Sequence, residues 1–322
     1  MNFHTKIPLS PIPNDQIDYK SKVVLLGSCF AENIAKKLEY YKFNHVVNPF
    51  GILFHPIAIE TLIKKALTDQ SYTDKDLVFN NDKYHCLNAH SSLSNTSKSE
   101  LILSLNSILQ TTKQDVKEAS HIVITLGTAW VYRFLNTQQV VANCHKISQK
   151  QFKKELLSTV QIERSLQSLV SLISLVNKNA RIIFTVSPVR HIKDGFVENA
   201  RSKANLLTAI HDFLDKSVVL KKEQLHYFPS YEIMMDELRD YRFYNQDMLH
   251  PSDLAIDYIW QRFLNVWVDP KTQPTLQLVE DVQKGIAHKP FDPSSSAHVN
   301  FLKQLELKKN QLTTLYPHIT FS

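Results

Sequence analysis

Short runs of apolar residues alternate with longer amphipathic stretches over most of the chain. The apolar runs lie at 22–26, 45–47, 121–126, 181–186 and 225–231. Apolar residues recur at helical spacing in the stretches between them, over 30–41, 56–67, 98–117, 150–178 and 198–217. Because continuous apolar strands that alternate with helices favour a parallel sheet covered on both faces, the pattern predicts an α/β doubly wound sandwich.

Two segments near the N-terminus fall outside this alternation. Residues 1–20 are rich in Pro, Asn and Asp, which indicates an irregular lead-in to the fold. Residues 77–90 favour a small inserted β-hairpin that turns at Asn80-Asn81-Asp82.

The C-terminal part of the sequence predicts helices only. An amphipathic helix is expected after Ser252, and two more are expected near 275–287 and 297–313, beyond a turn-rich segment. We therefore expect a main domain over 1–270 and a C-terminal helical appendage over 271–322.

Glycine is scarce in this sequence. The 322 residues include only 5 glycines, whereas average usage predicts roughly 22. All five stand alone, which excludes the clustered glycines of a dinucleotide fingerprint and of a Walker phosphate loop. The few glycines are therefore expected where φ is positive or where the backbone approaches another atom closely.

Charge and cysteine content exclude several other classes. The net charge of +6 is spread along the chain without a Lys/Arg run, so nucleic acid is not an expected partner. The 3 cysteines show no CxxC spacing, which argues against a disulfide framework and a structural zinc site, and we expect no cofactor or metal. Since neither a signal-peptide core nor an apolar span of membrane length is present, the expected location is the cytoplasm, without membrane contact.

Ser28 is the first candidate for chemistry. In open α/β sheets the ligand crevice lies beyond the carboxyl ends of the strands, and Ser28 follows the first apolar run and precedes a helix. Its hydroxyl would lie near backbone N–H groups of the first helical turn, which can stabilise an oxyanion. A purely structural helix cap is the alternative, since Ser is a favoured capping residue.

Asp247 and His250 are the second candidate. An Asp three residues before a His can hold the imidazole in one tautomer, which leaves the other ring nitrogen free to take a proton from a serine. The pair follows the fifth predicted strand, where the chain returns to the crevice.

These segments resemble a known family. Residues 27–31 (GSCFA) match the motif that gives the GSCFA family its name, and NPFGI, LGTAWVY, NCHK, TVSPVRH and DMLHPS are similar to that family as well. The family is similar to the SGNH (GDSL-like) hydrolases. The resemblance implies a three-layer α/β/α sandwich with a roughly five-stranded parallel sheet, which agrees with the hydrophobic pattern.

The resemblance also implies roles for single residues. Ser28 would be the nucleophile and would contribute its own N–H to the oxyanion hole, Gly51 would supply a second N–H, and Asp247 and His250 would be the orienting acid and the general base. The usual Gly-x-Asn block is here Gly127-Thr128-Ala129. An amide donor is therefore missing, and the hydroxyl of Thr128 or the amide of Asn48 is expected to replace it.

Cys29 is a rival nucleophile. A helix N-terminus lowers the pKa of a thiol. The Cys29 side chain lies one residue beyond that of Ser28 and should therefore point away from the direction of the serine hydroxyl. We expect Cys29 to be a buried, structural residue.

Five further residues are candidates for substrate binding. Arg190 could bind a carboxylate or phosphate, or could pair with Asp236 or Glu237. The other four are His191, Asn143, His145 and Trp130; the indole could stack on a sugar or belong to the core.

Three functions remain open on the sequence. The first is a serine esterase that acts on a small acyl or acetyl ester, with carbohydrate esters as one option, through an acyl-serine intermediate. The second is an acyltransferase with the same triad. The third is a non-catalytic binding protein on the same fold.

Overall fold

A computed structural model describes residues 5–321 of the chain; the first four residues of the expected lead-in and residue 322 lie outside them. A parallel five-stranded sheet forms the centre, with the order β10-β9-β5-β1-β2. Its strands are β1 (Val23–Gly27), β2 (His45–Val47), β5 (His121–Leu126), β9 (Arg181–Val186) and β10 (Leu225–Tyr227). The predicted α/β sandwich and the five predicted main strands are therefore confirmed.

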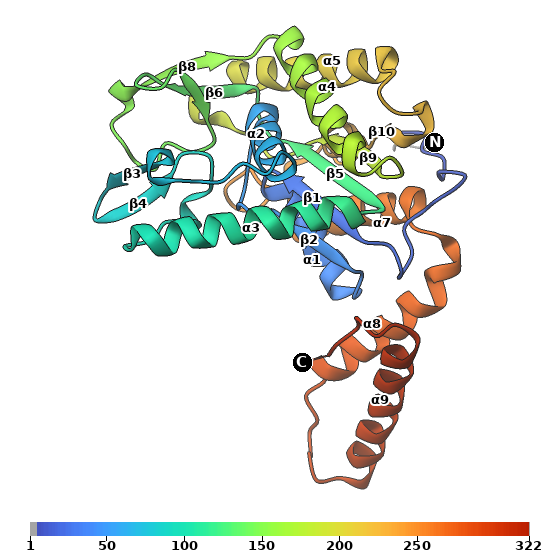
Figure 1. Ribbon diagram of the computed structural model, residues 1–322. Helices are drawn as coiled ribbons and strands as arrows, with labels where there is room; N and C mark the ends of the chain where they lie inside the picture. Colours follow the sequence, from blue (N-terminus) through green and yellow to red (C-terminus); the bar gives the residue numbers. More distant parts are fainter. Residues whose placement is uncertain (1–4, 322) are drawn as a thin grey trace.

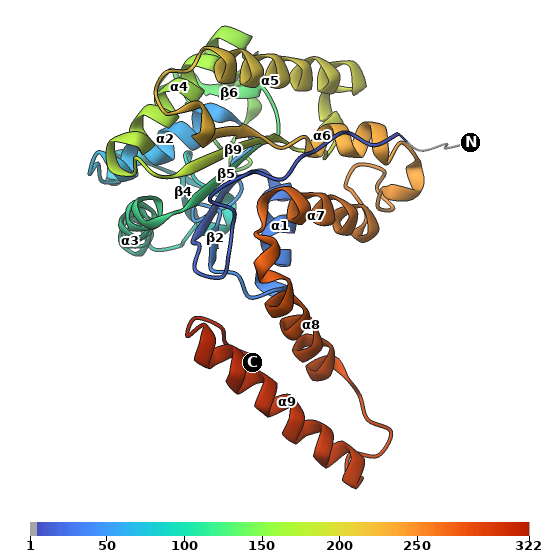
Figure 2. The ribbon, with the colours of Figure 1, turned by 90° about the vertical axis from the view of Figure 1, so that its right-hand side faces the viewer.

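Helices cover both faces of this sheet (Figures 1 and 2). One face packs against α2 (Pro56–Leu67), α3 (Lys98–Glu118), α4 (Thr159–Val176) and α5 (Phe196–Lys216). The other face packs against α1 (Cys29–Tyr40) and α7 (Asp253–Trp267). The result is a three-layer α/β/α architecture.

The alternation of side chains along β1 explains why both faces are covered. Val24 and Leu26 belong to the hydrophobic core on the α2 side, whereas Val23 and Leu25 belong to the core on the α1 side. Successive side chains of a strand point to opposite faces, so an apolar residue at every position requires an apolar neighbour layer on each side.

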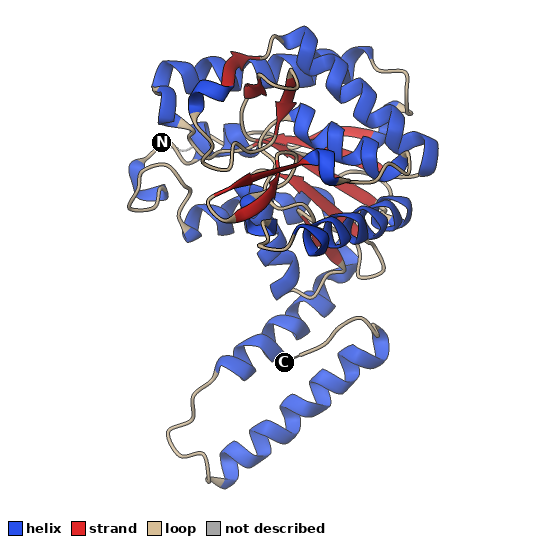
Figure 3. Cartoon of the chain, turned by 60° about the vertical axis from the view of Figure 1, so that its left-hand side comes forward, coloured by secondary structure: helices blue, strands red, loops and turns tan. Residues whose placement is uncertain are grey.

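Two small antiparallel sheets are attached to the main sandwich (Figure 3). The first is the predicted hairpin, made of β3 (Leu77–Asn80) and β4 (Lys83–Cys86). The second contains β6 (Trp130–Phe134), β7 (Gln139–Val141) and β8 (Phe152–Leu156).

The helix predicted over 150–178 is therefore wrong at its start. Residues 152–156 pair with β6 as strand β8, and α4 begins only after Ser158, whose side chain caps it together with Gln161. Helical spacing alone did not reveal that β6 offers this segment an antiparallel partner.

The C-terminal residues form α8 (Gln273–Ala287) and α9 (Ser296–Leu315), which project from the sandwich as a hairpin of helices (Figures 1 and 2). Its root is tied to the main body, because the ring of Tyr316 packs at a tilt against that of Tyr19 and Gln283 donates a hydrogen bond to the carbonyl oxygen of Tyr40. Within residues 5–321 no helix has both the length and the apolar character that crossing a membrane requires.

Candidate active site

Ser28 lies in the turn between β1 and α1. Gly27 has φ +132°, and a Cβ there would lie 2.0 Å from the carbonyl oxygen of Thr125, so only glycine fits. Ser28 is the N-cap of α1, and its Oγ accepts a long hydrogen bond from the Phe30 N–H (3.4 Å). The serine is 0% exposed.

The neighbouring strand end belongs to Gly127. β1 and β5 are adjacent in the sheet, and the chain leaves them in opposite directions, toward β2 and toward β9. Such a switch point is where α/β sheets place their ligand crevice. A Cβ at Gly127 would lie 3.1 Å from Ser28 Cβ, 3.2 Å from His191 Nε2 and 3.2 Å from the Phe54 carbonyl oxygen.

Asp247 and His250 form the expected pair. Asp247 Oδ2 lies 2.6 Å from His250 Nδ1, and its Oδ1 accepts the N–H groups of Leu249 (2.8 Å) and His250 (3.0 Å). The His250 N–H, the Leu249 N–H and the imidazole together lower the pKa of Asp247 to about 2. The carboxylate therefore stays charged and holds the imidazole through Nδ1, while Nε2 has no hydrogen-bond partner within residues 5–321. Both side chains are about half exposed.

Arg190 ties the loop of this pair to the end of β9. Its N–H donates to the carbonyl oxygen of Leu249 (3.1 Å), and Nη1 lies 3.4 Å from the carbonyl oxygen of Met248. The guanidinium stacks on Tyr244, 4.1 Å from the ring centroid. Asp236 and Glu237 pair instead with Arg239 and Arg262.

Lys203 is a buried residue that the sequence analysis did not single out. It projects from α5, is 1% exposed, and donates from Nζ to the carbonyl oxygens of Gly127 and Ser187 (both 2.7 Å). Burial lowers the pKa of its ammonium to about 7. A lysine on the apolar side of the helix predicted over 198–217, in step with Leu206 and Ile210, was the signal available in the sequence.

His191 lies next to the serine. Its Nε2 is buried and has no hydrogen-bond partner within residues 5–321. Burial, together with the nearby charges of Lys203 and His250, lowers the pKa of His191 to about 3, so the imidazole is neutral at physiological pH. Because the Arg190 N–H is bonded to the Leu249 carbonyl oxygen, the next residues of the two loops, His191 and His250, lie near each other.

The expected oxyanion donors differ in their availability. The Ser28 N–H donates to the carbonyl oxygen of Thr125 (3.0 Å), and the Gly51 N–H donates to that of Asn48 (2.7 Å). Thr128 Oγ1 is bonded to Ser202 Oγ (3.0 Å).

Asn48 is the expected donor that remains free. Its Oδ1 accepts the Gly27 N–H (2.8 Å), which fixes the amide beside the β1 end, and its buried Nδ2 has no partner within residues 5–321. Asn48 Nδ2 is therefore an available amide donor at this strand end.

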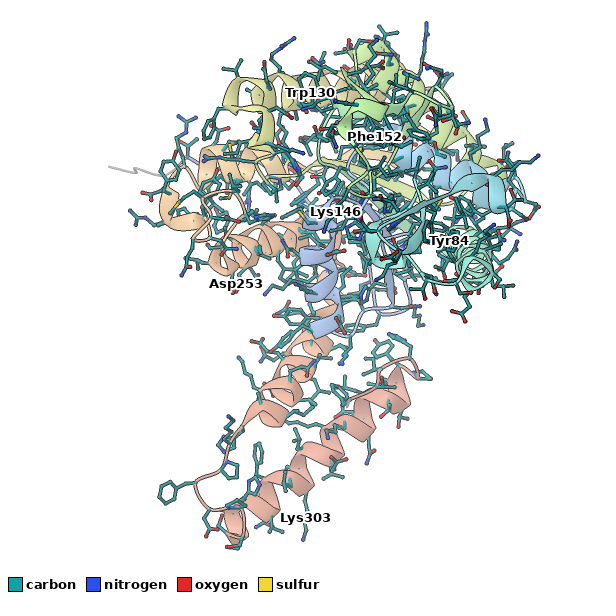
Figure 4. The ribbon with its side chains drawn as sticks, turned by 90° about the vertical axis from the view of Figure 1, so that its left-hand side faces the viewer. Tyr84, Trp130, Lys146, Phe152, Asp253 and Lys303 are labelled. Atoms are coloured by element: carbon teal, nitrogen blue, oxygen red, sulfur yellow. The ribbon has the colours of Figure 1, made fainter. Side chains whose placement is uncertain are left out.

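The other predicted binding residues have structural partners. Trp130 Nε1 donates to the carbonyl oxygen of Glu198 (3.1 Å), beside α5 (Figure 4). Asn143 Oδ1 accepts the His145 N–H (2.8 Å), and His145 Nε2 bonds the carbonyl oxygen of Cys86 (2.8 Å) on the hairpin. The structure does not join these three residues to Ser28.

Cys29 is a weak nucleophile in this setting. Burial, and secondarily the charge of Glu32, raises the pKa of its thiol, which disfavours the thiolate. Among the described residues, no three His, Cys, Asp or Glu side chains are grouped so that they could hold a metal ion.

Two cavities lie near the 234–244 segment. One of about 130 Å³ is bounded by Arg190, Tyr241, Tyr244 and three apolar residues of the 234–238 segment. Another, of about 800 Å³, is lined by residues 5–8 and 236–243. Neither lining includes Ser28, Asp247 or His250, and the first cavity reaches the site only through Arg190.

Comparison with solved structures gives distant similarities. A carbohydrate esterase family 3 protein from Talaromyces cellulolyticus is 8% identical, over 81% of this chain and 99% of that chain, with a TM-score of 0.35. An acetyl esterase mutant, solved with an acetate ion, is 9% identical, over 81% of this chain and 99% of that chain, with a TM-score of 0.37. An acetyl xylan esterase from the rumen bacterium Butyrivibrio proteoclasticus is 9% identical, over 84% and 66%, with a TM-score of 0.38.

Comparison of sequences gives a clearer result. No curated protein matches significantly. A model described as the GSCFA family matches residues 22–263, and one described as the C-terminal domain of GSCFA domain proteins matches residues 279–322. The chain therefore belongs to the GSCFA family.

Proposed function

We propose that the protein is a serine esterase that cleaves a small acyl or acetyl ester, including esters carried by carbohydrates, through an acyl-serine intermediate. The observation that carries this proposal is the Asp247–His250 pair, with 2.6 Å between Oδ2 and Nδ1, in a loop bonded to Arg190 after β9. Arg190 precedes His191, which lies next to Ser28 at Gly127. A carboxylate that orients an imidazole near a serine is the arrangement that activates a hydroxyl.

The proposed first half-reaction transfers the acyl group to Ser28. His250 Nε2 accepts the hydroxyl proton while Oγ bonds to the carbonyl carbon and the C=O electron pair moves onto the oxygen. When the C=O bond re-forms, the bond to the alcohol oxygen breaks, and His250 returns the proton to the departing alcohol. Water then repeats these steps on the acyl-serine and releases the acid.

Ser28 must leave its capping position for this chemistry. Within residues 5–321 its Oγ has one hydrogen bond, the 3.4 Å contact from the Phe30 N–H, and none to His250. Such a long bond contributes little, so rotation about χ1 costs little. Hydrogen bonds between catalytic groups are often long without substrate and shorten in its complex.

Two groups support the developing oxyanion in this proposal. The Cys29 N–H belongs to the first turn of α1, where backbone donors have no partner inside the helix. Asn48 Nδ2 is the free amide at the adjacent strand end. Asn48 thereby takes over part of the role of the asparagine that is absent after Gly127.

The test is hydrolysis of 4-nitrophenyl acetate by the wild-type protein and two variants. Ser28→Ala should abolish turnover without changing the thermal unfolding midpoint. Asp247→Asn should lower kcat by about 100–10,000-fold, because the amide no longer enforces the imidazole tautomer. Ser104→Ala, at an exposed serine of α3, is the matched control.

Undiminished turnover by Ser28→Ala would refute the assignment. Product that forms only when an alcohol acceptor is added would identify acyl transfer as the reaction of the same groups.

A further inference from the structure

We propose that His191 is a further catalytic residue, whose Nε2–H donates a hydrogen bond to the substrate oxygen as it becomes an oxyanion. In this role the imidazole replaces the side-chain amide that is missing from Gly127-Thr128-Ala129. The inference deepens the proposed function and rests on it.

The position of His191 is the first argument. Ser28 Cβ and His191 Nε2 border the same narrow space beside Gly127, 3.1 and 3.2 Å from the point that a Cβ of this residue would occupy, so the two atoms lie close to each other. The Cβ point itself is too close to the Gly127 Cα for another atom, but a carbonyl oxygen held beyond it, beside the serine, can come within hydrogen-bond distance of Nε2. The Phe54 carbonyl oxygen that also borders the space already accepts the N–H groups of Gly127 and Thr128.

The second argument is the unused nitrogen. Buried polar side-chain atoms nearly always have a partner, because an unpaired one loses its hydrogen bonds to water. His191 Nε2 is buried and unpaired within the described residues. A substrate oxygen bound above Gly127 would satisfy it.

The third argument is that the imidazole is held in place before substrate binds. The backbone N–H of His191 donates to Asn199 Oδ1 (2.9 Å) on α5, which fixes the main chain that carries the ring. The ring packs edge-on against Phe54, with the centroids 5.3 Å apart and the planes at 79°. A donor that is already oriented needs no rearrangement when charge develops on the substrate.

The protonation state fits a donor and not a base. Burial, Lys203 and His250 keep the pKa of His191 far below neutral, so the ring carries one hydrogen at physiological pH. A neutral imidazole can polarise a carbonyl oxygen, but with this pKa it is a poor acceptor for the Ser28 proton. Asp247 orients His250, so the general base is the other histidine.

Three substitutions of His191 separate the possible roles, with 4-nitrophenyl acetate as the substrate. His191→Gln places an amide nitrogen near the position of Nε2, His191→Asn places it near Nδ1, and His191→Ala removes it. We expect the His191→Ala and His191→Asn variants to lower kcat about 100–1000-fold with little change in KM, which is the loss typical of one oxyanion donor. Gln should recover at least tenfold of that loss.

The controls keep folding and function apart. The unfolding midpoints of the three variants should agree within a few degrees, and His318→Gln, in the C-terminal segment, should hydrolyse like wild type. Wild-type kcat in His191→Ala would overturn the inference and leave the proposed function standing. Equal losses of kcat in His191→Gln and His191→Ala would show that His191 does not act as a hydrogen-bond donor. A wild-type protein without Ser28-dependent hydrolysis would overturn both proposals.

Discussion

Replacing Lys203 by methionine tests whether burial at the strand ends keeps the lysine side chain neutral in the folded protein. Burial lowers the pKa of its ammonium from 10.5 to about 7 in the folded protein. A neutral amine has two N–H groups, and the carbonyl oxygens of Gly127 and Ser187 accept two hydrogen bonds. The folded state therefore does not need the charge.

The size of the effect follows from this pKa difference. Between pH 7 and 10.5 the unfolded chain keeps a proton on this lysine that the folded protein has lost, so the free energy of unfolding rises with pH. The slope approaches about 1.4 kcal/mol per pH unit. From pH 7.5 to 9.5 the wild type should gain about 2–3 kcal/mol relative to Lys203→Met.

Urea unfolding followed by tryptophan fluorescence at pH 7.5, 8.5 and 9.5 measures this difference. Other groups titrate equally in both proteins and cancel. Lys303→Met, at an exposed lysine of α9 (Figure 4), should keep the pH dependence of the wild type. A difference between wild type and Lys203→Met that does not change with pH would refute the reasoning, because the lysine would then be charged in both states.

Three further predictions concern the site and its support. Gly127→Ala should lower kcat at least tenfold, because the new Cβ would lie closer than ordinary contact distance to Ser28 and His191 and would displace them; unchanged hydrolysis would contradict this. Arg190→Ala should lower kcat about tenfold by loosening the loop of the catalytic pair, whereas Arg242→Ala, at an exposed arginine paired with Asp240, should not. Burial lowers the pKa of His55 to about 4. Between pH 4 and 6.5 the unfolded chain therefore carries a proton on His55 that the folded protein does not. His55 should therefore lower the free energy of unfolding by about 2 kcal/mol at pH 5 relative to pH 7. Urea unfolding of the wild type and of His55→Gln at both pH values measures this loss, and an equal loss in the two proteins would contradict the prediction.

The main sheet could be predicted from sequence because its strands consist mostly of apolar residues. Val23 to Leu26 face two cores, and such a run has few other stable environments. The strand β8 could not be predicted in this way, because its lysines and its glutamate follow no clear period and its partner β6 lies about twenty residues earlier.

The predicted site divides along similar lines. Ser28 follows a buried strand and Asp247 and His250 are neighbours in sequence, so local pattern was enough to single them out. The availability of each oxyanion donor depends on contacts that the sequence does not reveal. The N–H of Gly51 is used by a local turn, whereas Asn48 Nδ2 has no partner among the described residues. Lys203 was overlooked because its partners, the strand-end carbonyl groups, have no signature in the sequence.

The most direct test of the central claim is covalent labelling of the serine. The pure protein is treated with a fluorophosphonate probe, and the adduct is mapped by mass spectrometry in the wild type and in His250→Ala. We predict an adduct on Ser28 that is lost or strongly reduced when His250 is replaced, because the hydroxyl reacts only when the imidazole takes its proton. Absence of an adduct on every serine, or an equal yield of Ser28 adduct in His250→Ala, would contradict an activated nucleophile at this site.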